Sequence, residues 1–288
     1  MPAPTRTVWA FDAIGTAWSV ETTEPLTDTA RDEVTALIDD FDLSWSRFRD
    51  DSLVTTLARD GGRVPAPRDA PAMLDLYVDL DAATAGAVNP LVGDALARLG
   101  YDARLSLVAL SPEPAPSWRQ LLTWGDETLA LAEPATIDVG ALGKGRLVDL
   151  VLEALRRHDL GDVVVDASGD LAARGAAQRV GLEHPYRPGQ AIGVVEVTDA
   201  ALCASATNRR AWGDGLHHVL DARTGVPVQA YAATWALAPT AMLADAVATA
   251  LFFDGGPQLA AERGVEWVRM RTDGRVEWSP GSTAELFS

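Results

Sequence analysis

The amino-acid sequence predicts an α+β fold with mixed, largely antiparallel sheets and packed helices. Strand-like segments follow one another as meanders, at residues 8–20, 178–202 and 265–278, and helical patterns are interspersed between them. A chain of 288 residues with 48% apolar residues can also bury a large core. We therefore expect one globular unit, residues 1–288, made of two intimately packed lobes. The segment 111–117 holds three prolines and is the best candidate for a seam between them.

In the N-terminal half, apolar residues at helical spacing predict a helix over 28–41, with Thr27 or Asp28 as its cap. The polar segment 44–52 carries two arginines, and its plain interpretation is a solvated loop. The other elements expected here are two strands that meet at Ala13-Ile-Gly-Thr16, a short helix from Leu53, a helix over 70–85, and a helix that opens at Pro90, with Asn89 as its cap, and runs to Leu99.

In the C-terminal half, a short β-branched run at 136–139 precedes a glycine-rich turn and an amphipathic helix, which predicts strand, loop and helix. The remaining elements expected are a buried strand at 163–167 closed by Ser168-Gly-Asp170, a strand pair within 178–202, a strand and turn from His217 to Pro227, a strand at 234–237, an apolar helix from Pro239 to Phe253, and a C-terminal hairpin of 265–271 and 275–278.

The stretch from Thr136 to Arg146 is the most distinctive in the chain. Its glycines at 140, 143 and 145 permit a positive φ and a close approach of the backbone to a ligand. A turn that opens a helix also presents unpaired N–H groups, so a phosphate is the expected guest. Lys144 is the only lysine, beside 23 arginines, although a solvated lysine in a tight turn is the alternative. The spacing is that of neither a P-loop nor a dinucleotide fingerprint.

Asp245 and Thr249 form a candidate metal site. They lie four residues apart on an otherwise apolar helix, so their oxygens face the same way. Burial of an unpaired carboxylate is costly, and a hard divalent cation with oxygen ligands would compensate for it. The alternative is that Asp245 pairs with an arginine and Thr249 bonds back to a helix carbonyl. The spacing alone favours neither interpretation.

The pair His217-His218 makes up half of the four histidines. Because neighbouring side chains of a strand point to opposite faces, only one of the two can face a site. The turn Asp221-Ala-Arg-Thr-Gly225 behind them can orient a ligand, although a surface histidine is the commoner case. A Ser-His-Asp hydrolase built from Ser168 or Ser205 with His218 is a weaker alternative, because Ser168 lacks the G-x-S-x-G of a nucleophile elbow.

Composition excludes several classes of function. The formal net charge of −17 argues against a nucleic-acid partner, which would require cationic side chains to neutralise phosphates. Cys203 is the only cysteine, so neither an intrachain disulfide nor a thiolate metal site is expected. No apolar run approaches the ~20 residues of a membrane span, and the first residues lack the apolar core of a signal peptide. As written, the chain is expected to be cytoplasmic.

Seven motifs occur in order along the chain: Ile14-Gly-Thr16, Ser46-Arg-Phe-Arg-Asp-Asp-Ser52, Gly86-Ala-Val-Asn-Pro90, Asp138-Val-Gly-Ala-Leu-Gly-Lys-Gly145, Val165-Asp-Ala-Ser-Gly-Asp170, His218-Val-Leu-Asp-Ala-Arg-Thr-Gly225 and Ala244-Asp-Ala-Val-Ala-Thr249. Together they resemble the motifs of the ApbE family, the magnesium-dependent FAD:protein FMN transferases, which read M-G-T, S-x-F-x-x-x-S, G-A-F-D-P, D-L-G-x-I-A-K-G, V-N-x-G-G-D, H-I-I-D-P-x-T-G and A-D-x-x-x-T. The family's T-S-G-D-Y departs furthest, because only its serine remains in Ala204-Ser-Ala-Thr-Asn208.

The resemblance implies an enzyme of ApbE-like fold that splits FAD, transfers FMN to a Ser or Thr hydroxyl of an acceptor flavoprotein, and releases AMP. It implies Mg²⁺ held by Asp245, Thr249 and a loop carbonyl, most simply that of Ala141. His218 would be the base, Lys144 would lie near the phosphates and Asp221 would orient the turn. The FAD contacts that it implies are Ile14, Gly15, Thr16, Asp138, Gly140, Gly143, Lys144, Gly169, Asp170, Ser205, His218 and Thr224.

Two alternatives stay open at this point. The same site could act as an FAD pyrophosphatase, with water in place of the acceptor hydroxyl. The altered T-S-G-D-Y motif could instead mark a flavin-binding protein without catalysis. Many members of the family are exported lipoproteins, so the compartment of the acceptor is not fixed by the resemblance, and the sequence does not identify the acceptor itself.

Overall fold

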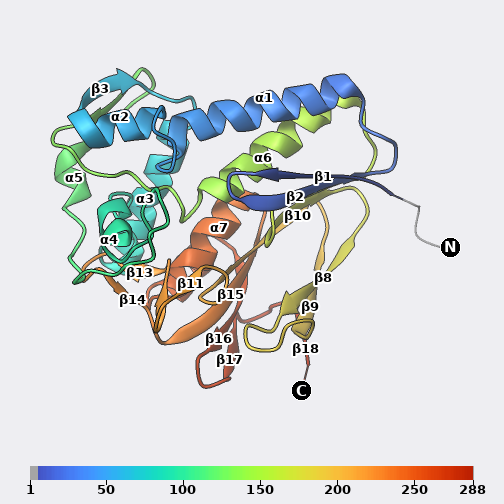
Figure 1. The fold of residues 1–288 in the computed structure, drawn as a ribbon. Coiled ribbons are helices and arrows are strands. Elements are labelled where there is room, and N and C mark those ends of the chain that lie inside the picture. The colour runs from blue at the N-terminus through green and yellow to red at the C-terminus, as the bar shows by residue number, and fades with distance from the viewer. Residues whose placement is uncertain (1–5, 288) are drawn as a thin grey trace.

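The computed structural model describes residues 6–287 and shows a central sheet of eight strands (Figure 1). The strand order is β1-β2-β6-β7-β10-β15-β16-β17, and every neighbouring pair is antiparallel. The α+β class with largely antiparallel sheets is therefore confirmed. The strands are β1 (Thr7–Ala13), β2 (Thr16–Thr22), β6 (Val163–Asp166), β7 (Asp170–Arg174), β10 (Ala200–Ala206), β15 (Tyr231–Ala238), β16 (Glu266–Arg271) and β17 (Val276–Trp278).

Both faces of this sheet are covered, because side chains alternate along each strand. In β6, Val163 and Val165 pack against the helices, whereas Val164 packs on the other face. There it meets a second, three-stranded sheet in the order β18-β9-β8. These strands are β8 (Gln178–Glu183), β9 (Ala191–Val197) and β18 (Glu285–Leu286). The result is three layers: helices, central sheet and small sheet.

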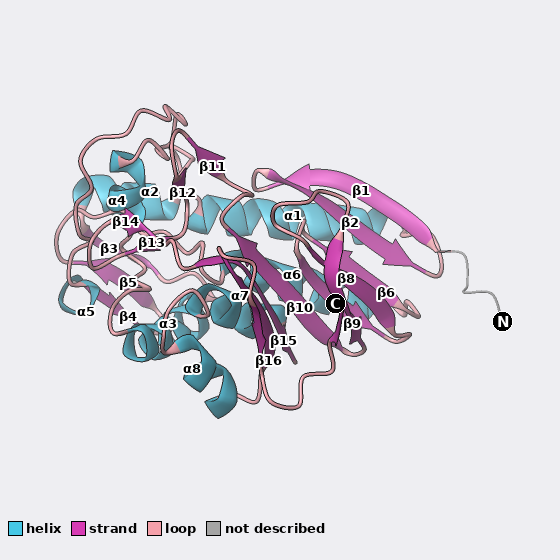
Figure 2. Cartoon of the chain, turned by 90° about the horizontal axis from the view of Figure 1, so that it is seen from below, coloured by secondary structure: helices cyan, strands magenta, loops and turns pink. Residues whose placement is uncertain are grey.

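The helical layer contains α1 (Asp28–Trp45), α6 (Gly143–Leu155) and α7 (Ala241–Ala250). The long α1 lies beside α6 (Figure 1), and the central strands cross in front of both (Figure 2). The Thr27 side chain caps α1 by accepting from Ala30 N at 3.2 Å. Asp149 of α6 accepts from the backbone N of Ala241 (2.7 Å) and of Met242 (2.9 Å), so α6 fixes where α7 begins.

A smaller group of elements packs at one end of these layers. It contains α2 (Leu53–Asp60), α3 (Ala70–Thr84), α4 (Gly93–Arg98), α5 (Trp118–Leu121), α8 (Gly256–Glu262), and a three-stranded sheet of β3 (Gly62–Pro65), β5 (Thr128–Leu131) and β4 (Leu122–Trp124). The short helical turn η1 (Arg156–His158) follows α6 instead, where His158 pairs with Glu33 of α1. Two short strand pairs, β11 (Ala211–Trp212) with β12 (Leu216–His217) and β13 (Leu220–Asp221) with β14 (Val226–Pro227), lie beside α4. That residues 111–117 mark a seam stays a prediction.

The strand expected at 136–139 does not form. Residues 136–139 belong to no strand, and single backbone contacts hold them, from Thr136 N to Asp94 Oδ2 (3.0 Å) and from Asp138 N to Pro90 O (2.8 Å). A β-branched run indicates an extended backbone and cannot show whether a partner strand is present.

Two helix boundaries were also expected too early. Asn89 Oδ1 accepts from Leu91 N (2.8 Å) and forms a turn, so α4 begins at Gly93 and not at Pro90. The helix expected from Pro239 begins at Ala241 instead, because Thr240 is its cap and accepts from Leu243 N at 3.4 Å. The strands β3, β4 and β5 were not expected, since three or four residues are too few to show a period.

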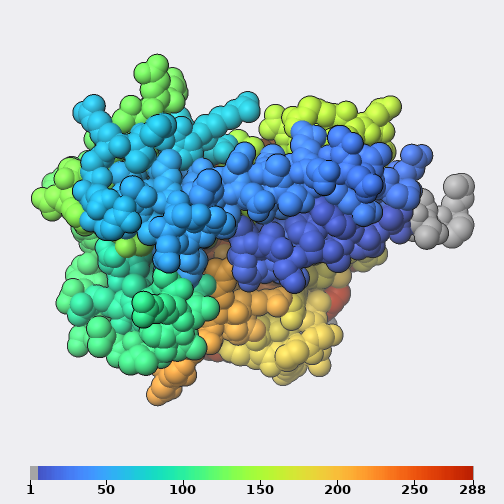
Figure 3. Space-filling view, turned by 45° about the horizontal axis from the view of Figure 1, so that its top comes forward, coloured from blue at the N-terminus to red at the C-terminus, as the bar shows by residue number. Residues whose placement is uncertain are grey.

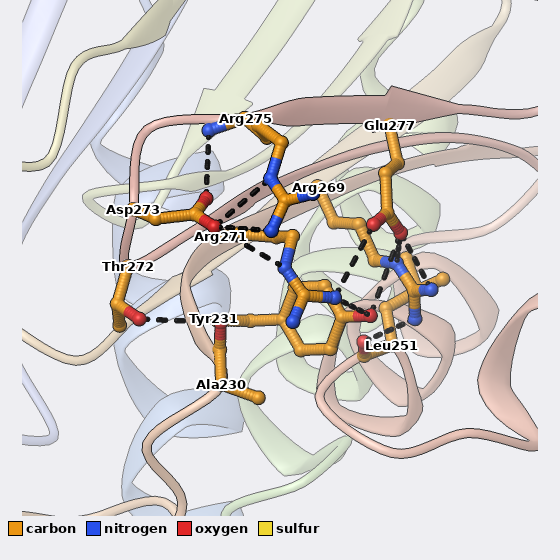
Figure 4. A network of polar contacts seen from close by, with 9 residues as sticks. All are labelled: Ala230, Tyr231, Leu251, Arg269, Arg271, Thr272, Asp273, Arg275 and Glu277. Carbon is orange, nitrogen blue, oxygen red and sulfur yellow. Dashed lines mark hydrogen bonds and ion pairs between the residues drawn. The ribbon is translucent and has the colours of Figure 1, made fainter.

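The C-terminal hairpin of β16 and β17 is confirmed, and a polar network fastens it to the end of α7 (Figure 4). Arg269 is 9% exposed and donates from Nε to Glu277 Oε2 (2.7 Å) and from Nη1 to Leu251 O (3.1 Å). Its guanidinium lies 4.1 Å from the centre of the Tyr231 ring. Within residues 6–287, no helix is long and apolar enough to cross a membrane.

Candidate active site

A cavity of about 900 Å³ opens where the helical layer, the end of the central sheet and the smaller group of elements meet. Its walls come from segments far apart in the chain: the β1–β2 turn, the segment after α1, the loop before α6, the turn between β6 and β7, the end of β10 and α7. Figure 3 shows parts of the chain that are far apart in sequence, in blue, green and orange, meeting on one face of the molecule. A volume of this size is typical of sites for large organic ligands.

Most of the residues expected from the sequence line this cavity. Those that do are Ile14, Gly15, Thr16, Asp138, Gly140, Ala141, Gly143, Lys144, Gly169, Asp170, Ser205, His218, Asp245 and Thr249. Asp221 and Thr224 do not line it. They belong to the turn beyond His218, where Asp221 Oδ1 accepts from Arg223 N (3.0 Å) and Thr224 Oγ1 accepts from Val226 N (3.2 Å). Their contacts hold the turn itself, so they shape the backbone near His218 without reaching the cavity.

The three glycines of the loop before α6 allow close packing, and the positive φ expected for them is wrong. None of Gly140, Gly143 and Gly145 has a positive φ. A Cβ on Gly145 would lie 2.2 Å from Ala241 O and 2.7 Å from Asp245 Cβ. Helices α6 and α7 can therefore approach only because position 145 has no side chain.

The backbone N–H groups of these three glycines all have acceptors within the protein. Gly140 N donates to Asp138 Oδ1 (2.7 Å), Gly143 N to Val139 O (2.8 Å) and Gly145 N to Asp245 Oδ2 (3.0 Å). These donors form hydrogen bonds within the loop and with Asp245. These three glycine N–H groups therefore do not stabilise an anionic ligand in the cavity, whereas side chains or a bound cation could.

Asp245 and Thr249 face Ala141 across the contact between α6 and α7. Thr249 Oγ1 donates to Ala141 O (3.2 Å), and Asp245 is 4% exposed with Gly145 N as its hydrogen-bond donor. Burial, and then the nearby Asp170, raise the pKa of Asp245 well above its usual value. Neither alternative contact forms, because Asp245 has no arginine partner in residues 6–287 and Thr249 does not bond within its own helix.

Lys144 lies on the other side of Asp245 and bridges to the turn between β6 and β7. Its Nζ is 3.1 Å from Asp170 Oδ2 and donates to Ala167 O (3.0 Å). Burial works to lower the pKa of Lys144, but the carboxylates of Asp170 and Asp245 outweigh it and raise that pKa. The interpretation of Lys144 as a solvated residue is therefore wrong: it is a charged group held at the floor of the cavity.

Asp170 is the most buried carboxylate of the site, at 1% exposed. Apart from the ion pair with Lys144, neither of its oxygens has a hydrogen-bond partner in the part of the chain that the structure describes. Two carboxyl groups and one ammonium thus share this floor, so negative charge would exceed positive charge if both carboxyl groups were ionised. Such an arrangement is costly unless a further cation balances it.

Arg47 is a site residue that the sequence interpretation missed. The segment after α1 was expected to be a solvated loop, but Arg47 is only 8% exposed. It donates from Nε to Asp138 Oδ2 (2.5 Å) and from Nη1 to Tyr101 O (2.9 Å). Burial works to raise the pKa of Asp138, but Arg47 and the Gly140 N–H lower it overall. The signal available in the sequence was the position of Arg47 inside one of the seven motifs.

The two adjacent histidines lie in different surroundings, as the strand argument predicts. His217 is buried, its Nε2 is 2.8 Å from Val228 O, and its Nδ1 accepts from Val219 N (3.3 Å). His218 lines the cavity, and its Nδ1 has no partner in residues 6–287. Burial, and next the charge of Arg210, lower the pKa of His218 to about 3, so its ring is neutral at physiological pH.

Ser168 and Ser205 both line the cavity, but neither forms a hydrogen bond with His218 among the described residues. Ser168 Oγ donates to Ala17 O (2.8 Å) instead. Ser168 and Ile14 also take positive φ values, of 55° and 45°, which are uncommon for residues other than glycine and cluster at functional sites. A hydrolase with a serine nucleophile therefore has no support here.

Comparison with known proteins shows which family the chain belongs to. The sequence profile described as "ApbE family" matches residues 14–273. The chain belongs to the ApbE family. A protein of Treponema pallidum named FAD:protein FMN transferase is 30% identical, over 88% of this chain and 80% of its own length. One of the same name from Rhodobacter capsulatus is 29% identical, over 72% of this chain and 43% of its own length.

Solved structures of ApbE proteins share the fold. The ApbE protein of Thermotoga maritima superposes with a TM-score of 0.83 at 19% identity, covering 96% of this chain and 97% of that one. The flavin transferase ApbE of Vibrio cholerae gives a TM-score of 0.80 at 19% identity, over 96% and 97% of the two chains. The ApbE-like fold expected from the motifs is thereby confirmed.

Proposed function

We propose that this chain transfers FMN from FAD to a Ser or Thr hydroxyl of an acceptor flavoprotein and releases AMP. The observation that carries the proposal is the convergence of Lys144, His218 and the Asp245–Thr249 pair on one cavity of about 900 Å³. The names of the curated relatives and the membership of the ApbE family support it. The acceptor hydroxyl would attack the phosphorus of the FMN half, the bond to the AMP phosphate would break, and AMP would leave with the electron pair.

Mg²⁺ fits the oxygen atoms that the structure gathers. Asp245 and Thr249 of α7 and the carbonyl of Ala141 would hold it, and carboxylate, hydroxyl and carbonyl oxygens are ligands of hard cations. The raised pKa of Asp245 supports this, because the carboxylate form of that buried group lacks enough positive charge around it, and Lys144 is the only ion-pair partner of the neighbouring Asp170 in residues 6–287. When bound, Mg²⁺ would neutralise the charge of the diphosphate and favour departure of AMP. No three His, Cys, Asp or Glu side chains cluster as a metal site in residues 6–287, so backbone and hydroxyl oxygens are needed.

His218 would take the proton of the acceptor hydroxyl. It faces the cavity, its ring is neutral, and its Nδ1 is unpartnered, so it can accept a proton without losing an existing bond. A base with a pKa of about 3 would be weak, but the anionic phosphates of a bound substrate would raise that pKa. Lys144, fixed by Asp170 and Ala167, would position the phosphates beside it.

The test is a product analysis with FAD, Mg²⁺ and an acceptor flavoprotein. The proposal predicts AMP and denaturation-resistant flavin fluorescence on the acceptor in equal amounts. AMP with an equal amount of free FMN, and no flavin on the acceptor, would show a pyrophosphatase. Binding of FAD without release of AMP would show a flavin-binding protein. Either of these results would contradict the proposal.

A further inference from the structure

The cations that line the cavity differ in whether a carboxylate neutralises them. Lys144 pairs with Asp170, and Arg47 pairs with Asp138. Two more arginines at the cavity mouth are also paired: Arg49 with Asp42 (3.2 Å) and Asp51 (2.9 Å), and Arg209 with Glu183. Arg210 lines the same cavity but has no ion pair and no side-chain hydrogen bond with any residue between 6 and 287.

The backbone around Arg210 is held on both sides. Before it, Asn208 Nδ2 donates to Pro185 O (2.6 Å) and Thr207 N donates to Ala232 O (3.0 Å). After it, the Trp212 indole is buried, donates to Leu99 O (2.8 Å) and stacks on Tyr101, with ring centres 5.4 Å apart. Arg210 therefore projects from a fixed segment, in the stretch that follows the altered motif Ala204-Ser-Ala-Thr-Asn208.

The charge of Arg210 acts on the groups that the proposed function uses. It lowers the pKa of His218 by repulsion and contributes to lowering the pKa of Asp138. Lys144 already contacts Asp170 and Ala167, whereas the Arg210 side chain has no hydrogen-bond partner between residues 6 and 287.

We infer that Arg210 binds a phosphate group of the flavin nucleotide, as a second cationic contact beside Lys144. A guanidinium presents several N–H donors in a planar fork that matches the geometry of phosphate oxygens. The N–H groups of Gly140, Gly143 and Gly145 already have acceptors, so the guanidinium would supply phosphate contacts that these glycines do not. This inference rests on the proposed function and adds a residue that the seven motifs do not contain.

The test is the affinity for FAD, measured in the presence of Mg²⁺ by quenching of flavin fluorescence over a range of salt concentrations. Loss of a charge-assisted phosphate contact should weaken FAD binding by roughly 10- to 100-fold in Arg210→Gln. The dependence of affinity on salt should become shallower, because one ion pair is lost. Arg210→Lys, which keeps the charge without the fork, should bind FAD with an intermediate affinity.

Two charge-matched controls define what would overturn the inference. Arg209→Gln removes the neighbouring arginine, which Glu183 already neutralises, and Arg187→Gln removes an exposed arginine outside the cavity. Both should bind FAD within about twofold of the unaltered chain. Unchanged affinity in Arg210→Gln, or an equal loss in either control, would overturn the inference. Thermal unfolding of each variant checks that it is folded, and FMN transfer by the unaltered chain tests the proposed function independently.

Discussion

Two neighbouring histidines show how the chain divides structural from chemical roles. The ring of His217 is bonded at both nitrogens, to Val228 and Val219, inside the protein. The ring of His218 faces the cavity with an unpartnered Nδ1. A buried ring with both bonds made contributes to stability, whereas a ring with a free nitrogen in a cavity can take a proton.

The two histidines should therefore respond differently to the same substitution. His218→Ala should lower the rate of FMN transfer by roughly 10²–10⁴-fold, the usual loss on removal of a general base, with FAD affinity retained. His217→Ala should leave the transfer rate of the folded protein nearly intact and lower the free energy of unfolding by about 1–3 kcal/mol. Transfer rates, FAD affinity and urea unfolding of both variants provide the test. Equal losses of rate would show that the base is assigned wrongly.

The lowered pKa of His218 also predicts a pH dependence of stability. In the folded chain this pKa is about 3, whereas an unfolded histidine titrates near its ordinary value of 6.5, so between these values the unfolded chain binds the extra proton. The contribution of His218 is fully present above about pH 6.5 and is lost as the pH falls toward 3. Between about pH 4 and 5.5, the free energy of unfolding should rise with pH more steeply than in His218→Gln, by about 1.4 kcal/mol per pH unit. If the free energy of unfolding depended on pH in the same way in the unaltered chain and in His218→Gln, this prediction would be contradicted.

At the residue scale, the sequence predicted many of the residues that line the cavity, but it assigned two turn residues to the site and missed one buried arginine. The alternation of a strand was enough to separate His218 from His217. The motif that contains His218 also carries Asp221 and Thr224, which serve the turn, and a motif does not distinguish the two roles. Arg47 was missed because a polar sequence does not reveal that a distant carboxylate, Asp138, buries it.

At the scale of elements, the site depends on how closely α6 approaches α7. Gly145 lies at the point of contact, where a Cβ would be 2.2 Å from Ala241 O. The same contact brings Ala141 to Thr249 and the Gly145 N–H to Asp245. A change in the spacing of the two helices would therefore disturb both the core and the oxygen atoms of the proposed Mg²⁺ site.

Gly145→Ala should accordingly lower both stability and function. Overpacking at a close backbone contact usually costs about 1–3 kcal/mol, and here it would also displace Asp245. Gly125→Ala is the matched control, because a Cβ there meets nothing within 4 Å and its φ is not positive. The temperature of thermal unfolding and the rate of AMP release should both be lower in Gly145→Ala. Both should be unchanged in Gly125→Ala. A Gly145→Ala variant as stable and active as the control would contradict this account of the contact.

The sequence predicted long elements better than short ones. Helices α1 and α3 were found because apolar residues recur over several turns, and the hairpin of β16 and β17 because a turn divides two alternating runs. The start of α4 was misplaced because Asn89 forms a turn with Leu91 and does not cap the helix, and the start of α7 because Thr240, and not Pro239, marks it. The three-stranded sheet of β3, β4 and β5 has strands too short to leave a pattern.

At the scale of the whole molecule, the cavity is a product of the fold. Its walls include Ile14, Lys144, His218 and Asp245, which lie far apart in the chain. The order of the motifs could predict that such residues share a site, since the chain resembles the ApbE family. It could not predict that Lys144 would pair with Asp170 or that Arg210 would stay unpaired, because these depend on distances in space.

The measurement that tests this account most directly is AMP release from FAD as a function of Mg²⁺ concentration, in the unaltered chain and in Asp245→Asn. The substitution keeps the shape of the side chain and removes the carboxylate charge, so most of the affinity for a hard cation should be lost. The account predicts AMP release that rises with Mg²⁺ and disappears in excess chelator, and almost none from Asp245→Asn at the same Mg²⁺ concentration. Full release in excess chelator, or from Asp245→Asn, would contradict it.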